Sequence, residues 1–183
     1  MNIEIREYAV GAYLKHVLKC DVVDYKVKDQ SGGLKSLPEI DVIGFKFNTQ
    51  KDKKPMAYLC EVKTHITGLA KMAGEKDRVK QLNDQFKNME TYASKNLTLF
   101  DVKFLFWAPK VTHKELTNAI SNHYLAEGQF INKKYSTAIA ELIEFASKNG
   151  RITDNPFIRT LQVVTHLKDL PNNLTNSKRK KIV

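Results

Sequence analysis

Two segments joined by a polar linker constrain the fold of this chain more than any other feature. Glu39–Phe47 and Met56–Lys63 have the length and residue types of strands, and the linker Asn48–Lys54 suits a turn. A simple antiparallel hairpin across that linker pairs residues whose numbers add up to about 102. The apolar pairs that follow from this register are Phe45 with Ala57 and Ile43 with Leu59. Their agreement supports the register, because a slip by one residue would turn every side chain to the other face.

The same register brings two acids together. Asp41 lies opposite Glu61 on an otherwise apolar face, and Lys63 follows on that face at the end of its strand. Directly opposed like charges destabilise a sheet, so the arrangement needs a compensating cation. Mg²⁺, for which Mn²⁺ can substitute, prefers such oxygen ligands and keeps coordination sites for water and phosphate.

We therefore predict that Asp41 and Glu61 are metal ligands and catalytic residues. Lys63 is the third catalytic candidate, because an ammonium group there can stabilise charge on a scissile phosphate or help to deprotonate water. The alternative is structural: Glu61 and Lys63 merely flank a strand end and pair with solvent or with each other.

The segments Pro38-Glu39-Ile40-Asp41 and Glu61-Val62-Lys63, with an apolar strand between them, resemble the signature of the PD-(D/E)xK nuclease superfamily. The resemblance implies an α/β fold with a restriction-endonuclease-like αβββαβ core, in which a mixed central sheet is flanked by helices. It covers roughly Glu4 to Trp107. Here Pro38 is separated from Asp41 by two residues, a departure that many members tolerate.

Glu7 is a third candidate metal ligand. A helix predicted over Ile5–Lys19 places Glu7 on the same face as Val10 and Leu14, so its carboxylate points inward and needs a partner. The resemblance implies the same role, because many family members carry a glutamate on this helix that completes the metal shell. The alternative is an acid favoured only by the helix dipole, a role that Glu4 fills equally well.

The helix after the signature offers Arg78, Gln81 and Gln85 along one side. Several branches of the family use a glutamine or a basic residue there to orient the site or hold phosphate, so we expect nucleic-acid contacts from these three. In one branch a tyrosine follows four residues after the glutamine, whereas Gln85 follows Gln81 here. A plain solvated helix face is the alternative.

Hydrophobic spacing and turn signals predict one domain over residues 1–170, followed by a basic, flexible tail over 171–183. Besides the elements above, the pattern predicts strands over Asp21–Val27, Thr98–Trp107 and Phe157–Leu167, and helices around Val79–Ala93, after Thr112 and over Ser136–Asn149.

The charge balance favours a polyanionic partner. Thirty Lys and Arg residues against twenty Asp and Glu residues give a net charge of +10, and each phosphate that a cation neutralises releases condensed counterions. DNA is the expected partner, RNA stays open, and a homodimer is expected if both strands of a duplex are cut. We expect no membrane partner, because no stretch is apolar enough to span a bilayer. The start MNIEIREYAV lacks the pattern of a signal peptide, so a cytoplasmic location is expected.

These features together predict a Mg²⁺-dependent DNA endonuclease that hydrolyses phosphodiester bonds, of a restriction, repair or junction-cleaving type. Water activated by a metal needs no nucleophilic Ser or Cys from the protein. One rival is a non-catalytic nucleic-acid-binding module on the same fold, although a pure binder has no need of acids near phosphate. Another is a hydrolase of small phosphoesters, which leaves the charge of +10 unexplained.

The tail gives a first test. We expect the affinity for DNA to fall log-linearly as salt rises, and deletion of Ser177–Val183 to weaken binding to all sequences and flatten that slope. Filter binding or fluorescence anisotropy over a salt series measures both quantities. An unchanged slope would reduce the tail to a solubility feature.

Overall fold

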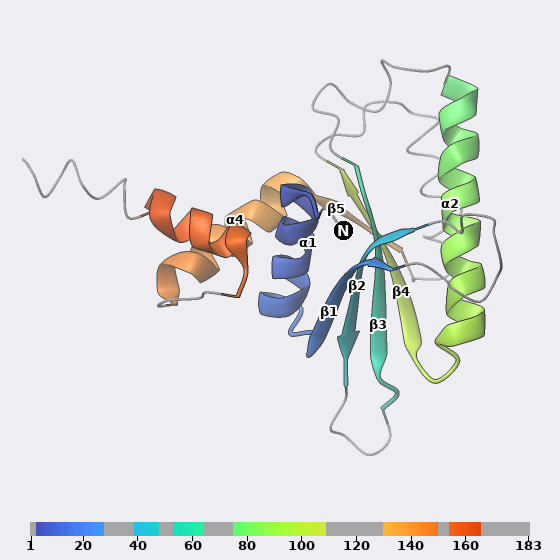
Figure 1. Ribbon diagram of the computed structural model, residues 1–183, viewed down its shortest axis with the longest axis horizontal. Helices are drawn as coiled ribbons and strands as arrows, with labels where there is room; N and C mark the ends of the chain where they lie inside the picture. Colours follow the sequence, from blue (N-terminus) through green and yellow to red (C-terminus); the bar gives the residue numbers. More distant parts are fainter. Residues whose placement is uncertain are drawn as a thin grey trace, which may run out of the picture.

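A five-stranded mixed sheet forms the middle layer of the structure, and helices cover both of its faces (Figure 1). The computed structural model describes residues 3–27, 39–47, 53–63, 75–108, 130–149 and 154–165. In chain order the elements are α1 Ile5–His16, β1 Val22–Val27, β2 Ile40–Lys46, β3 Met56–Val62, α2 Glu75–Asn96, β4 Asp101–Ala108, β5 Phe130–Lys134 and α4 Tyr135–Lys148. A further helix spans residues 156–165.

The sheet has the strand order β1-β2-β3-β4-β5. β1 pairs with β2 and β2 with β3 in antiparallel fashion, whereas β4 runs parallel to β3 and β5 parallel to β4. The prediction of an α/β domain with a mixed central sheet flanked by helices is therefore confirmed, and the first six elements follow the predicted order of helix, three strands, helix and strand.

The predicted hairpin register is also confirmed. Ile43 lies opposite Leu59 and Phe45 opposite Ala57. Backbone pairing between β2 and β3 runs as far as Val42 with Cys60, so the next residues on the two strands are Asp41 and Glu61. The register thus delivers both acids to one end of the sheet.

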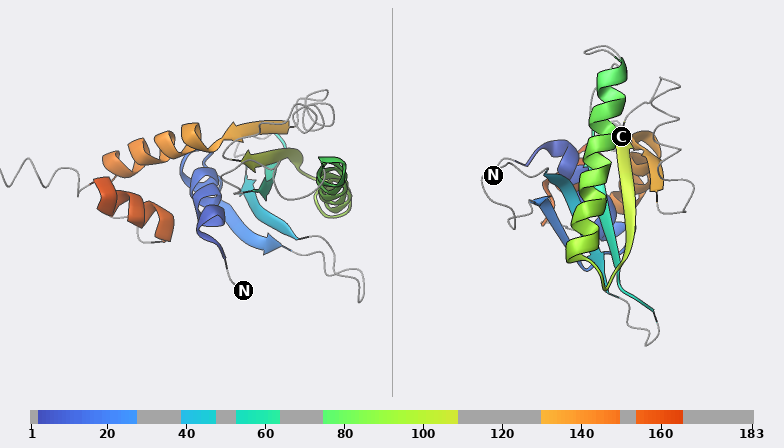
Figure 2. Two further views of the ribbon diagram at one scale, coloured as in Figure 1. Left: turned by 90° about the horizontal axis from the view of Figure 1, so that it is seen from above. Right: turned by 90° about the vertical axis from the view of Figure 1, so that its right-hand side faces the viewer.

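Each face of the sheet packs against its own helices, as the two views of Figure 2 show. One face packs against α2, and its buried residues include Ile43, Leu59, Phe104 and Phe106 from the strands with Leu82, Phe86 and Met89 from the helix. The opposite face packs against α1 and α4, and its buried residues include Val42, Cys60 and Trp107 with Leu14 and Leu142. Both cysteines are buried and free.

The C-terminal part of the sequence prediction was partly wrong. Residues 156–165 form a helix and not the strand predicted over Phe157–Leu167. Asn155 caps this helix, since its Oδ1 accepts hydrogen bonds from the N–H groups of Phe157 (2.9 Å) and Ile158 (3.1 Å). Asn followed by Pro156 is a helix-start signal, and the apolar run behind it obscured that signal.

One further strand was missed, and two predicted segments cannot be compared with the structure. Strand β5 was not predicted, because Phe130–Lys134 has no run of apolar residues. The helix predicted after Thr112 and the tail over 171–183 lie outside the described residues. Among the helices that are described, none is both long and apolar enough to cross a membrane.

Asn155 also docks its helix on α1, because its Nδ2 donates to the Tyr8 carbonyl at 3.2 Å. We expect Asn155→Ala to lower the free energy of unfolding by about 1–2 kcal/mol, through loss of the cap. Asn155→Asp keeps the cap acceptor and loses the donor, so it is expected to fall between Ala and wild type. Urea unfolding measures this, with Asn96→Ala at the exposed end of α2 as the control. An Ala variant as stable as wild type would contradict it.

Candidate active site

Asp41 lies at the start of β2, where its side chain continues the pairing with β3. Its Oδ2 accepts a hydrogen bond from the Val62 backbone N–H at 2.7 Å. On the other side of β3, the Lys63 N–H donates to the Trp107 carbonyl of β4 at 2.8 Å. The backbone around Glu61 is therefore held from both neighbouring strands, which fixes the direction of its side chain.

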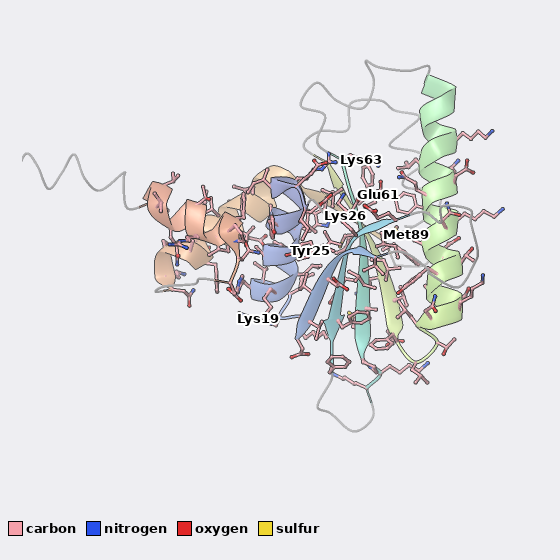
Figure 3. The ribbon with its side chains drawn as sticks, in the orientation of Figure 1. Lys19, Tyr25, Lys26, Glu61, Lys63 and Met89 are labelled. Carbon is pink, nitrogen blue, oxygen red and sulfur yellow. The ribbon has the colours of Figure 1, made fainter. Side chains whose placement is uncertain are left out.

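Glu61 is the most deeply buried of the three predicted catalytic residues, with a side chain that is 2% exposed. The Lys63 ammonium group forms an ion pair with Glu61 Oε1, and Gln85 of α2 forms a side-chain hydrogen bond with the same carboxylate. Figure 3 shows Glu61 and Lys63 close together at this end of β3. The structure thus contains the Glu61–Lys63 pair that was one of the alternatives from sequence.

Burial is the main influence on the pKa of both acids. Burial raises the pKa of Glu61 from its ordinary 4.5 to about 7, and the Asp41 carboxylate adds to the rise, while Lys63 and Gln85 oppose it. Burial also raises the pKa of Asp41, against the lowering effect of the Val62 N–H and Lys63. Neither lysine nor amide therefore satisfies the two carboxylates fully.

Glu7 reaches the same end of the sheet from α1, and its side chain is fully buried. Its Oε1 lies 2.7 Å from Lys26 Nζ, and its Oε2 accepts a hydrogen bond from the Glu4 N–H at 2.9 Å. The Glu7 charge also raises the pKa of Asp41, so the two groups are electrostatically coupled. The inward direction predicted for Glu7 is observed, whereas its role as a metal ligand stays a prediction.

Sequence reasoning missed Lys26 and Glu39. Lys26 Nζ lies 3.1 Å from Glu39 Oε1, besides its contact with Glu7. The structure places Lys26 opposite Asp41, because its neighbours pair as Tyr25 with Val42 and Val27 with Ile40. Neither Lys26 nor Glu39, which lies just before β2, is marked by a signal in the sequence.

The helix residues predicted to touch nucleic acid divide into two groups. Gln85 forms a side-chain hydrogen bond with Glu61, and its contact with nucleic acid stays a prediction. Arg78 and Gln81 lie on α2, but their side chains fall outside what the structure describes.

The donor set fits a hard divalent cation in chemistry, although not as a ready-made cage. Among the described residues, no three His, Cys, Asp or Glu side chains form a group that could hold a metal ion. Lys26 forms an ion pair with Glu7, and Lys63 forms one with Glu61. Asp41 and Glu61 nevertheless supply neighbouring oxygen donors of the kind that a hard divalent cation prefers, and burial raises the pKa of both carboxyl groups.

The chain was also compared with protein-family models, with curated proteins and with solved structures. None of the three comparisons gives a match.

A stability measurement in chelator tests the buried acid pair. The raised pKa means that the Glu61 contribution to stability is present below about pH 4.5 and is lost as the pH rises through about 7. Glu61→Gln removes this loss. We therefore expect the variant to resemble wild type at pH 4.5 and to exceed it at pH 8, by about 1 kcal/mol on the scale of a cross-strand charge pair.

The control is Glu90→Gln on the exposed face of α2, which is expected to follow wild type at every pH. Adding Mn²⁺ at pH 8 is expected to raise the Tm of wild type by mass action and to leave Glu61→Gln nearly unchanged. A Glu61→Gln variant that is less stable than wild type at pH 8, with a full Mn²⁺ response, would falsify the paired-carboxylate site.

Proposed function

We propose that this protein is a metal-dependent endonuclease that hydrolyses phosphodiester bonds in DNA. The observation that carries the proposal is the pair Asp41 and Glu61, two buried carboxylates with raised pKa values, with the Lys63 ammonium group beside them. Buried carboxylates with raised pKa values are typical of sites that bind a divalent cation. A lysine beside them can stabilise the negative charge of a phosphate.

The arrangement of the elements supports a restriction-endonuclease-like fold for this function. The order of helix, three strands, helix and strand, with the acids at one end of β2 and β3, resembles the core of the PD-(D/E)xK superfamily. We propose membership of that superfamily on these grounds.

The residues have distinct parts in the proposed reaction. Asp41 and Glu61 would hold Mg²⁺ or Mn²⁺ through their carboxylate oxygens. The metal, when bound, supplies an activated water and neutralises charge on the phosphate. Lys63 is 28% exposed, so its ammonium group can exchange Glu61 for a phosphate oxygen or for the attacking water. Gln85 would fix the orientation of Glu61 through its hydrogen bond. Glu7, on α1, would add negative charge beside the metal and is paired with Lys26.

DNA is the proposed substrate because the net charge is +10 although the site itself gathers acids. Basic residues elsewhere on the surface can hold the backbone of a nucleic acid while the site engages one phosphate. A homodimer in the cytoplasm that acts in restriction, repair or junction cleavage is part of the same proposal, with RNA as the alternative substrate.

A specific observation favours a second candidate, a nucleic-acid-binding module without activity. In the structure, Lys63 and Lys26 neutralise two of the acids, and ion pairs of this kind can hold a fold together without any metal. The two candidates differ in whether DNA is cut once Mg²⁺ or Mn²⁺ is supplied.

The test is incubation of the purified protein with plasmid, linear and branched DNA, with Mg²⁺, with Mn²⁺ and with chelator. We expect cleavage only with metal. Asp41→Asn, Glu61→Gln and Lys63→Ala are each expected to lower the rate by about 100-fold or more, as for removal of a charge-stabilising group. Lys63→Ala is expected to keep most of its DNA affinity.

Matched controls lie on the exposed face of α2: Asp84→Asn, Glu90→Gln and Lys80→Ala are expected to cut at the wild-type rate. Gel retardation without cleavage in any metal would favour the binding module. Hydrolysis of a small aryl phosphodiester with no effect on DNA would favour a small-molecule phosphodiesterase. Wild-type rates in all three site variants would show that the site assignment is wrong.

A further inference from the structure

Lys26 has an unusual backbone conformation for a residue inside a strand. Its φ is +55°, in the left-handed region, and among the described residues other than glycine only Lys19 shares this feature. The pairing of β1 with β2 skips Lys26, although the residues on either side of it are paired. Such strain in a residue with a side chain persists where the surroundings hold it, and it gathers at functional sites.

The contacts of the Lys26 side chain explain what holds it. Nζ lies 2.7 Å from Glu7 Oε1 and 3.1 Å from Glu39 Oε1, so one ammonium group bridges two acids. The hydrogen bond to Glu7 is the largest influence on Lys26 and raises its pKa, so the group is positively charged. Figure 3 shows Lys26 on the same side of the sheet end as Glu61 and Lys63.

Both oxygen atoms of the Glu7 carboxylate have a neighbouring polar group in this arrangement. Lys26 engages Oε1, the Glu4 N–H engages Oε2, and no part of the side chain is exposed. A buried carboxylate without a countercharge would be strongly unfavourable, so the ion pair with Lys26 stabilises Glu7 in its buried position.

The acids and lysines at this end of the sheet can be summed to a net charge. Glu7, Glu39, Asp41 and Glu61 carry four negative charges when ionised, and Lys26 and Lys63 carry two positive ones. The net charge of −2 matches a single divalent cation. Lys26 carries one positive charge against Glu7 and Glu39, and Lys63 carries one against Asp41 and Glu61, so each half of the cluster keeps one negative charge.

We propose that Lys26 is a positioning residue of the site, which pairs with Glu7 and bridges it to Glu39, so that Asp41 and Glu61 hold one divalent metal ion without Glu7 as a ligand. The inference rests on the proposed function for the metal. It differs from the expectation based on resemblance, in which Glu7 itself completes the metal shell. Lys26 occupies the place that a second cation would otherwise take.

The first arm of the test uses thermal melts in chelator, where no metal takes part. Lys26→Met leaves Glu7 buried without a countercharge, so its Tm is expected to fall by about 5 °C or more. The double variant Glu7→Gln with Lys26→Met removes the unpaired charge and is expected to recover most of that loss. Lys46→Met is the control, since this half-buried lysine of β2 bonds to the Leu18 carbonyl at 3.1 Å and to no carboxylate in the described structure.

The second arm measures Mn²⁺ binding by isothermal titration calorimetry. Wild type is expected to bind one ion, and Glu7→Gln is expected to bind it with an affinity within about threefold of wild type. Lys26→Met is expected to bind Mn²⁺ about tenfold more tightly or to take a second ion, because removal of a nearby positive charge strengthens attraction to a cation. Lys46→Met is expected to bind like wild type. A purely structural role for Lys26 would lower stability and metal affinity together.

The outcomes separate this inference from the proposed function. If wild type binds Mn²⁺ and Glu7→Gln loses tenfold or more in affinity, Glu7 is a ligand and the inference is overturned while the nuclease proposal stands. Weaker binding in a folded Lys26→Met variant overturns the inference as well. If wild type binds no Mn²⁺ at all, the metal site fails and both proposals fail with it. If Lys26→Met does not fold, the Glu7→Gln titration and the double variant still decide.

Discussion

The pairing of β2 with β3 is the constraint on which the rest of the site depends. Their register brings Asp41 and Glu61 to neighbouring positions at one end of the sheet, and the Asp41 carboxylate then takes the Val62 N–H as a partner of its own. A slip of either strand by one residue would carry its acid to the opposite face, toward α1 and α4 and away from α2. The apolar pairs between Phe45 and Ala57 and between Ile43 and Leu59 prevent that slip, because they pack under α2. The chemistry of the site is thus fixed by hydrophobic packing in the middle of the strands.

Two lysines near Asp41 and Glu61 offset part of the negative charge of the buried acids. Lys63 and Gln85 approach Glu61 from the strand end and from α2, and Lys26 joins Glu7 to Glu39. These contacts make it tolerable to bury acids at all, since an unpaired charge in the interior is very unfavourable. They do not bring Glu61 back to an ordinary pKa, and the remaining shift is a physical argument for a cation there. The ion pairs thus allow the acids to be buried, and the remaining pKa shift of Glu61 agrees with the metal that we propose.

Prediction from sequence succeeded where the pattern is local. The alternation in Glu39–Phe47 and Met56–Lys63 was enough to give the hairpin and its register, and helical spacing gave α1, α2 and α4. It failed for residues 156–165, where an apolar run resembled a strand although Asn155-Pro156 marks a helix start. Strand β5 was not predicted, because the formation of a parallel strand at the sheet edge depends on pairing with its partner, β4, more than on the strand propensity of its own residues.

The sequence by itself determined which residues could carry chemistry, because Asp41, Glu61 and Lys63 are separated by spacings that a single hairpin brings together. Only the tertiary structure decided the partners. Lys26 meets Glu7 because α1 packs against β1, and Gln85 meets Glu61 because α2 covers that face of the sheet. These contacts join residues far apart in the chain, and they depend on how helices dock on the sheet. Ion pairs between distant residues leave no periodic trace in a sequence, whereas a hairpin does, because its pairing follows directly from the order of the residues.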